Sequence, residues 1–291
     1  MKAALYRPVR ETEIGETAEI FLIACADMYA RHNIKAATPE RAVVEQGYRH
    51  VFETGIFHVA EVDGRIAAVC HAIVRERLWF LSGFWMLPEF QRQRIGGALL
   101  KQVKDAGEQA GADTFFTWSS VDQTAMAGYM KQGMLPGYQI LTFAGALRDL
   151  PSSGDEYEVQ PLLLSNATEL DRRVRAAGRE VDHNYWLSQT GQDGRQLVRD
   201  GRPVGYYYFH NGVIGPAAWE DAADAEALLA AASSEAASHS EQIKLMIPGI
   251  NHTAIRFALR AGLRLSAYSH LLTTAPFGRM EQYLASGPLL F

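Results

Sequence analysis

The chain has 291 residues, which is long for one small domain and enough for two of similar size. Hydrophobic residues make up 48% of it and charged residues 21%, a composition that excludes disorder as the dominant state. The formal net charge of −5 argues against a surface that neutralises nucleic-acid phosphates, so we expect no nucleic-acid partner.

The two cysteines, Cys25 and Cys70, cannot build a multi-bridge disulfide scaffold, and the sequence holds no CxxC motif or Cys/His cluster for a metal. No apolar run approaches the roughly 18–20 residues of a membrane span. The first residues turn acidic and polar before the apolar core of a signal peptide could form. These features predict a cytoplasmic protein with no metal and no membrane partner.

Apolar periodicity and turn signals predict that helices open the first half and that a three-strand meander follows them. Asp63-Gly64 is typical of a tight hairpin turn, Pro88 ends the third strand, and Gly111 and Gly133 close the next two helices. In chain order we expect helices over 16–31 and from Thr38-Pro39 onward, strands over 56–62, 66–74 and 78–86, a helix over 96–110, a strand over 114–118, a helix over 124–132 and a strand over 140–144.

The stretch 150–156 is polar and rich in turn formers, so it predicts a linker. Beyond it the same order of elements starts again. We expect a helix over 166–177, strands over 195–198, 203–209 and 213–214, a helix from 221 to about 238, a strand over 243–247, a helix over 253–260 and a strand over 268–273.

Two sequence echoes support an internal repeat of this order. Asp63-Gly64-Arg65 recurs as Asp200-Gly201-Arg202, and Thr124-Ala125 with Gly133 recurs as Thr253-Ala254 with Gly262. Coincidence of common short motifs is the alternative. The repeat predicts one domain over 1–146, a linker over 147–157 and a second domain over 158–291.

The segment 91–98 lies between a predicted strand and a predicted helix and could hold a phosphate. The first turn of a helix has free backbone N–H groups and a partial positive charge. Gly96 and Gly97 let an anion approach the backbone, and Arg92 and Arg94 add full charges. A basic surface loop before a glycine-tolerant helix start explains the same residues equally well.

A second motif downstream places Tyr129 on a short helix after the next strand. With the turn it resembles the GCN5-related N-acetyltransferase (GNAT) family, in which a V-x-P strand end, a [RQ]-x-x-G-x-[GA] turn and an N-x-x-A-x-x-x-Y-x-x-x-G-F helix follow in this order. The matching positions are Leu87-Pro88, Gln91, Gly96, Ala125, Tyr129 and Gly133.

The resemblance implies an α/β (α+β) chain of two tandem GNAT-like domains, each a mixed, mostly antiparallel sheet flanked by helices. It also implies acetyl-CoA as cosubstrate, with its pantetheine arm beside the third meander strand and its pyrophosphate on the turn. Tyr129 then donates a proton to the leaving thiolate, although a purely structural core position would also explain this tyrosine. The cofactor-binding residues implied are Trp85, Met86, Leu87, Gln91, Arg92, Gln93, Arg94, Ile95, Gly96, Gly97, Ala98, Asp122 and Ala125.

The sequence departs from the family pattern in both halves. Arg94 replaces the first glycine of the turn, Asp122 the asparagine and Met134 the phenylalanine. In the second half, Ala258 takes the position of the tyrosine, and residues 215–221 contain no basic residue and no paired glycines. The second half therefore resembles a degenerate GNAT domain that does not bind CoA in the usual way.

The acceptor side is less defined by the sequence. Candidates for a general base are His58, Glu61, His71 and Glu76, and a water relay is an equal alternative. The dense polar and aromatic segment 179–186 is either a recognition surface or a solvated helix end.

These observations together predict an N-acetyltransferase. It would move the acetyl group of acetyl-CoA to a primary amine of a small molecule or peptide by direct attack in a ternary complex. A non-catalytic acyl-CoA-binding sensor or interaction module is the alternative, whereas a P-loop enzyme is disfavoured because no GxxxxGK[ST] occurs. The tail 277–291 is expected to pack on a domain or on a partner chain, which leaves a homodimer open.

Overall fold

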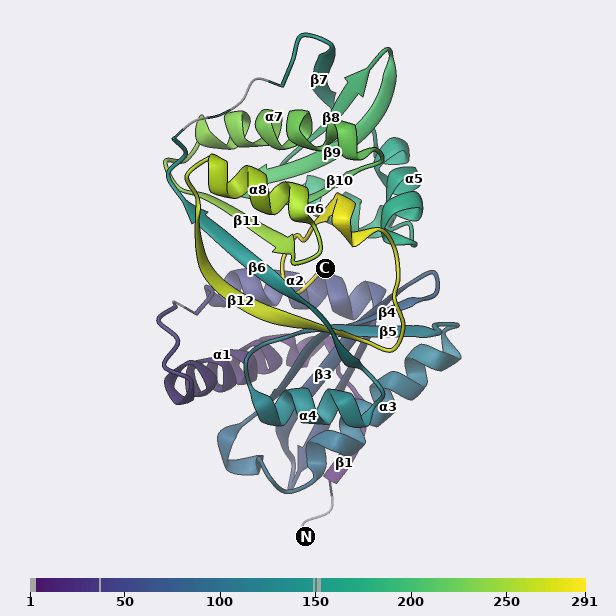
Figure 1. Cartoon of the computed structure of the whole chain (residues 1–291). Coiled ribbons are helices and arrows are strands. Elements are labelled where there is room, and N and C mark those ends of the chain that lie inside the picture. Colours follow the sequence, from purple (N-terminus) through teal and green to yellow (C-terminus); the bar gives the residue numbers. More distant parts are fainter. Residues whose placement is uncertain (1–3, 37, 149, 151–152) are drawn as a thin grey trace. The chain divides into compact units, whose positions relative to one another are not determined.

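The computed structural model describes residues 4–36, 38–148, 150 and 153–291 (Figure 1). Residues 149, 151 and 152 of the predicted linker lie outside this described part. The chain forms two compact units. Unit 1 consists of Met1–Leu135 and Leu272–Ala275, and unit 2 of Pro136–Leu271 and Pro276–Phe291.

This division differs from the predicted boundary at residue 146 because the halves exchange strand segments. Strand β6 (Leu135–Gly145) was expected to complete the first domain, yet it pairs antiparallel with β11 (Ile243–Pro248) and counts almost entirely in unit 2. The end of β12 (Arg264–Thr273) belongs to unit 1, where the Thr274 N–H donates to the Phe115 carbonyl at 2.9 Å.

Unit 1 contains a sheet in the order β1-β2-β3-β4-β5, antiparallel except for the parallel pair β4–β5. Its elements are β1 (Ala4–Pro8), α1 (Ile14–Arg31), α2 (Arg41–Thr54), β2 (Ile56–Val62), β3 (Arg65–Arg75), β4 (Leu78–Met86), α3 (Ile95–Gln109), β5 (Thr114–Ser119) and α4 (Gln123–Lys131). The predicted meander is confirmed, and Asp63 and Gly64 both take the positive φ angles of a tight hairpin turn. Helix α2 begins at Arg41, two residues later than predicted, with Glu40 at its N-cap.

A β-bulge in β4 decides which side chains face which side of this sheet. His71 of β3 pairs with Gly83 and Ala72 pairs with Leu81, so Ser82 is the extra residue. Leu81 before the bulge and Phe84 after it therefore pack in the same apolar cluster, together with helix α3. Helices α1 and α2 also pack on strands of this sheet.

Unit 2 repeats the plan with the strand order β12-β6-β11-β10-β9-β8-β7 and a short strand β13 beside β10. Its further elements are β7 (Tyr157–Pro161), α5 (Leu164–Arg175), α6 (Glu180–Ser188), β8 (Asp193–Arg199), β9 (Arg202–His210), β10 (Val213–Trp219), α7 (Ala225–Ala237), α8 (His252–Arg260) and β13 (Tyr283–Leu284). The order of elements matches that of the first half, which confirms the predicted repeat and the mixed, mostly antiparallel architecture.

The alanine-rich helix α7 forms the centre of the core of unit 2. Both of its leucines and all of its alanines except Ala237 are buried, and the helix packs on β9, β10 and β11, because short side chains let a helix approach a sheet closely. Among the residues that the structure describes, no helix combines the length and the apolarity needed to cross a lipid bilayer.

Candidate active site

Strands β4 and β5 separate partway along their length, and the candidate site begins at that point. They pair in parallel from Leu78 with Thr114 to Leu81 with Thr117. Beyond this register β4 continues to Met86 and β5 to Ser119 without further pairing between the two. The Thr117 hydroxyl donates to the Leu81 carbonyl at 3.2 Å, at the place where the strands part. The resulting V leaves one edge of β4 open for a ligand's hydrogen bonds.

Three of the predicted cofactor residues lie at the end of β4. On the opposite edge, Trp85 and Met86 pair with Val69 and Ala68 of β3. The Leu87 N–H donates to the Ala67 carbonyl at 3.0 Å, and the Leu87 carbonyl accepts from the Phe90 N–H. Because both main-chain groups of Leu87 already have partners, the open edge of β4 lies at the residues before it.

The predicted phosphate turn leads directly into α3. The N–H groups of Ile95, Gly96 and Gly97 lie in the first turn of this helix, and no side chain caps them. Ala98 is the fourth residue of the helix, so its N–H belongs to the backbone ladder. A Cβ added at Gly97 would meet no atom within 4 Å, so this part of the first turn is open to a ligand. A Cβ at Gly96 would come within 2.8 Å of the Phe84 ring, so Gly96 instead serves the packing of α3 on β4.

Arg92 and Arg94 both adopt the left-handed conformation, with φ angles of 63° and 65°. Arg94 is the N-cap of α3, and its left-handed conformation is one that glycine adopts without strain. Both arginine side chains are exposed, and Gln93 donates its side-chain amide to the Glu89 carbonyl at 2.9 Å. Gln91 reaches back to the Met86 carbonyl at 3.4 Å, which links the turn to the end of β4.

Tyr129 lies on α4, on the same side of the sheet as α3. Its side chain is 7% exposed, and its ring centroid lies 6.4 Å from that of Phe84. Burial raises the pKa of Tyr129, with smaller contributions from Cys70 and Asp122, so the phenol holds its proton at neutral pH. A protonated hydroxyl is the form that can act as a general acid.

Asp122 has a local structural role that the sequence analysis did not identify. It caps α4, because its carboxylate accepts from the N–H groups of Thr124 and Ala125 at 2.9 and 3.1 Å. It also pairs with Arg31 at 3.0 Å. Burial opposes ionisation, but the Ala125 N–H and the Arg31 guanidinium lower the pKa of Asp122. An aspartate directly before a helical run is a familiar N-cap signal that could have indicated this role.

The four candidate bases have different surroundings in the structure. Glu61 forms an ion pair with Arg7 at 2.8 Å, and Glu76 occupies the turn between β3 and β4 with a φ angle of 52°. His58 pairs in register with Cys70, on the face of the sheet that α3 covers. His71 is fully buried and lies next to Gly83, immediately beyond the bulge.

The corresponding V of unit 2 is occupied by the protein itself. Strand β10 pairs with β11 only at Val213 and Ile214, after which Ala217 and Ala218 pair with β13. On the other side, the Ala285 N–H donates to the Met246 carbonyl of β11 at 3.1 Å. Residues 283–285 thus lie between the two strands, where the first half has an open edge.

The segment 179–186 is not a simple solvated helix end, because three of its charged or polar side chains are buried while Glu180 and Asn184 are exposed. Arg179, Asp182 and His183 are each at most 1% exposed. Asp171 accepts from Arg179 and from the Tyr206 hydroxyl, and it contacts the His183 ring nitrogen at 3.0 Å. This network links α5 and α6 to β9, and its polar groups bond to one another.

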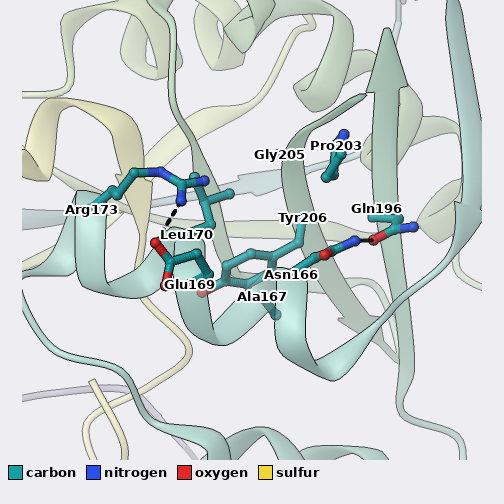
Figure 2. A pocket seen from close by; sticks show the side chains of 9 residues that line it. All are labelled: Asn166, Ala167, Glu169, Leu170, Arg173, Gln196, Pro203, Gly205 and Tyr206. Carbon is teal, nitrogen blue, oxygen red and sulfur yellow. Dashed lines mark hydrogen bonds and ion pairs between the residues drawn. The ribbon is translucent and has the colours of Figure 1, made fainter. Parts of the chain in front are cut away.

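A pocket of about 230 Å³ lies between α5 and strands β8 and β9 of unit 2, as Figure 2 shows. Its charged groups pair with each other, since Arg173 donates to Glu169 at 2.9 Å. None of the predicted cofactor residues lines it. We therefore place the candidate site in unit 1, at the V and the first turn of α3.

Comparisons with known proteins agree with this architecture. Residues 19–134 match the sequence model of the acetyltransferase (GNAT) family. No curated protein sequence matches the chain.

Several solved structures share the fold at low sequence identity. A putative acetyltransferase from Pyrococcus horikoshii superposes with a TM-score of 0.78 at 14% identity, over 100% of this chain and 97% of its own. A tandem GNAT protein from the clavulanic acid biosynthesis pathway gives 0.62 at 14% identity, over 94% and 99%. A GCN5-related N-acetyltransferase from Sphaerobacter thermophilus gives 0.63 at 15% identity, over 94% and 96%. At these identities the likeness establishes the fold.

Proposed function

Since residues 19–134 belong to the acetyltransferase (GNAT) family, we propose that this chain transfers the acetyl group of acetyl-CoA to the amino group of a small molecule or peptide. The observation that carries the proposal is the parting of β4 and β5 next to the uncapped first turn of α3. A thioester with a long amide-containing arm and a pyrophosphate needs both features at once: a strand edge for the amides and a helix start for the phosphates.

The residues of the turn fit the pyrophosphate of CoA. The N–H groups of Ile95 to Gly97 and the partial positive charge of the α3 N-terminus favour an anion. The exposed side chains of Arg92 and Arg94 add two positive charges at the same place. Gly97 leaves the approach free of a Cβ. In this proposal the open edge of β4 holds the pantetheine arm.

Tyr129 is the proposed general acid. The amine nitrogen attacks the thioester carbonyl directly, the C–N bond forms, the nitrogen gives up one N–H proton to a base, and the C–S bond breaks. The Tyr129 hydroxyl gives its proton to the departing thiolate. Because burial raises the pKa of Tyr129, the hydroxyl carries its proton at neutral pH and can donate it in this step.

Only the first unit is proposed to bind the cosubstrate. In unit 2, residues 283–285 occupy the strand edge that the pantetheine arm would use. In addition, Ala258 stands where the first half has Tyr129. Unit 2 in this proposal is a structural partner of the working unit.

The proposal is tested by titration calorimetry of the full chain with acetyl-CoA, followed by a thiol-release assay over a panel of amines. We expect a dissociation constant within the range of roughly 1 μM–1 mM that is typical of enzyme substrates, and thiol release with at least one amine. Absence of acetyl-CoA binding would overturn the proposal. Binding without thiol release on every amine would favour the sensor function instead.

A further inference from the structure

A histidine that the proposed mechanism does not use lies buried next to the V. His71 of β3 is 0% exposed and pairs in register with Gly83 of β4. Gly83 follows the bulge at Ser82 and lies two positions beyond Leu81, the last residue that pairs with β5. His71 therefore lies beside the part of β4 where the strands have separated.

Gly83 makes the room for this ring. A Cβ added at Gly83 would overlap the His71 imidazole, and Nε2 is the nearest atom. The Nε2 atom thus lies over the backbone of β4. A side chain on β4 itself could not occupy this position, whereas a ring that reaches across from β3 can.

His71 and Tyr129 lie on opposite faces of the sheet. The ring of His71 contacts Tyr48 of α2 and Phe57, with centroid distances of 4.6 and 4.8 Å. Tyr129 packs in the cluster of α3, which also contains Cys70, the residue next to His71 on β3. Neighbouring residues of a strand point to opposite faces, so an acid and a base placed in this way would approach a thioester in the V from its two sides.

Both ring nitrogens of His71 lack a hydrogen-bond partner among the residues that the structure describes, and so does the Tyr48 hydroxyl. Leaving a buried polar group unpaired costs about 1–3 kcal/mol, so such groups in folded proteins call for an explanation. Leucine or phenylalanine would fill this space without that cost. A polar ligand that enters from the side of α1 and α2 would supply the missing partner.

From this geometry we infer that His71 is the catalytic residue that accepts the proton of the acceptor amine. The inference rests on the proposed function. As the amine nitrogen forms its bond to the thioester carbon, its N–H proton passes to the lone pair of a His71 ring nitrogen, the C–S bond breaks, and the sulfur takes the proton of Tyr129. The products are the amide and the free thiol, with one positive charge on the imidazole and one negative charge on the phenol until protons exchange with solvent.

The surroundings of His71 favour an acceptor amine that binds in its neutral form. Burial lowers the pKa of His71 to about 3, so its ring is neutral at neutral pH. Among the described residues, Tyr48 on α2, Cys25 on α1 beside Tyr48, and Tyr29, which bonds to Cys25, are titratable groups on this face, and burial raises the pKa of each. Phe57 of β2 is the aromatic neighbour from the sheet, so an alkylammonium ion would find no carboxylate among these groups. The amine therefore binds in its neutral form.

The test compares His71→Gln with His58→Gln in the full chain. Glutamine can still form hydrogen bonds but cannot serve as a base, and His58 lies on the face that α3 covers. We expect His71→Gln to lower kcat/KM at least about 100-fold for an alkylamine, the lower end of general-base contributions. The loss should be smaller for an aromatic amine or a hydrazine, whose attached nitrogen is acidic enough to lose its proton to water. His58→Gln should change kcat/KM less than threefold for both classes.

The outcomes separate this inference from the proposed function. Failure of the unmodified chain to bind acetyl-CoA would overturn the proposed function itself. An active unmodified chain with kcat/KM within threefold in His71→Gln would overturn only the role of His71. An equal loss for alkyl and aromatic amines, or loss of acetyl-CoA binding in both His71→Gln and His71→Asn, would show a structural role and also overturn the inference.

Discussion

The ring of Phe84 on β4 lies against the backbone of Gly96 in the first turn of α3, so closely that an added Cβ would come within 2.8 Å of the ring. The neighbouring Gly97 faces open space, since nothing lies within 4 Å of its Cβ position. The two glycines of the turn therefore have different roles. One fixes the packing of α3 on β4, and the other keeps the approach to the first turn open.

Alanine substitutions should separate these two roles. We expect Gly96→Ala to lower the stability of the protein by about 1–3 kcal/mol, because overpacking forces Phe84 to move. Gly97→Ala should leave stability unchanged or raise it by up to about 1 kcal/mol, because alanine is the better helix former. Thermal unfolding measures both effects.

The Gly97→Ala substitution, which should not lower stability, should weaken acetyl-CoA binding. Gly97→Ala is expected to weaken acetyl-CoA binding at least tenfold in calorimetry, because its methyl group would stand where the pyrophosphate approaches. If Gly97→Ala binds acetyl-CoA as tightly as the unmodified chain, the first turn of α3 is not the phosphate site.

Tyr129→Phe should separate catalysis from binding. The substitution removes only the hydroxyl, so the ring still packs near Phe84 and the fold is retained. We expect kcat to fall about 100-fold, as general-acid contributions suggest, with the acetyl-CoA dissociation constant unchanged. Because burial raises the pKa of Tyr129, the activity of the unmodified enzyme should show no loss from this group up to at least pH 9. A decline of kcat with pH near 8 that disappears in Tyr129→Phe would contradict this prediction.

The exposed arginines of the turn should contribute to cosubstrate affinity through charge. We expect Arg92→Gln and Arg94→Gln each to weaken acetyl-CoA binding, with the double variant weaker than either single one. The difference from the unmodified chain should shrink as salt rises, because exposed charges are screened over about 8–10 Å at 0.1–0.15 M salt. Arg202→Gln, at an exposed hairpin position of unit 2, is the matched control and should have no effect. Salt-independent losses would point to a role in turn geometry instead.

The elements that the sequence predicts well are those with local signals. Asp63 and Gly64 form their turn because both tolerate the left-handed backbone, and the same holds for Asp200 and Gly201 in the second half. Gly111 and Gly133 end their helices with positive φ angles. Helix periodicity and these turns were therefore enough to reveal the repeat and the order of its elements.

The features that periodicity does not reveal depend on pairing between distant segments. Nothing in the sequence of β6 says that it pairs with β11 of the second half instead of completing the first domain. The placement of residues 283–285 between β10 and β11 is equally non-local. The distinction of His71 from His58 also needed the register of β3 and its neighbours, since a shift of one residue exchanges the faces of a strand.

The occupied V of unit 2 predicts one acetyl-CoA per chain. The main-chain groups of Ala217 and Ala218 pair with β13, so they are not available to a pantetheine arm. Calorimetry with acetyl-CoA should give a stoichiometry of one, and Gly97→Ala should weaken that single event. A second binding event that persists in Gly97→Ala would show that unit 2 also binds the cosubstrate.

The buried imidazole of His71 predicts how stability depends on pH, independently of catalysis. Its pKa is lowered from the usual 6.5 to about 3, so between these values the unfolded chain binds one proton more than the folded one. Stability should therefore fall as the pH is lowered through this window, by up to about 1.4 kcal/mol per pH unit from this group. His71→Leu removes the extra proton of the unfolded state, so its thermal midpoint should fall less between pH 6 and pH 4 than that of the unmodified chain. His252→Gln, at an exposed position, should follow the unmodified curve. Parallel curves for His71→Leu and the unmodified chain would mean that His71 takes up its proton at the same pH in the folded and the unfolded chain, which would contradict the lowered pKa of His71.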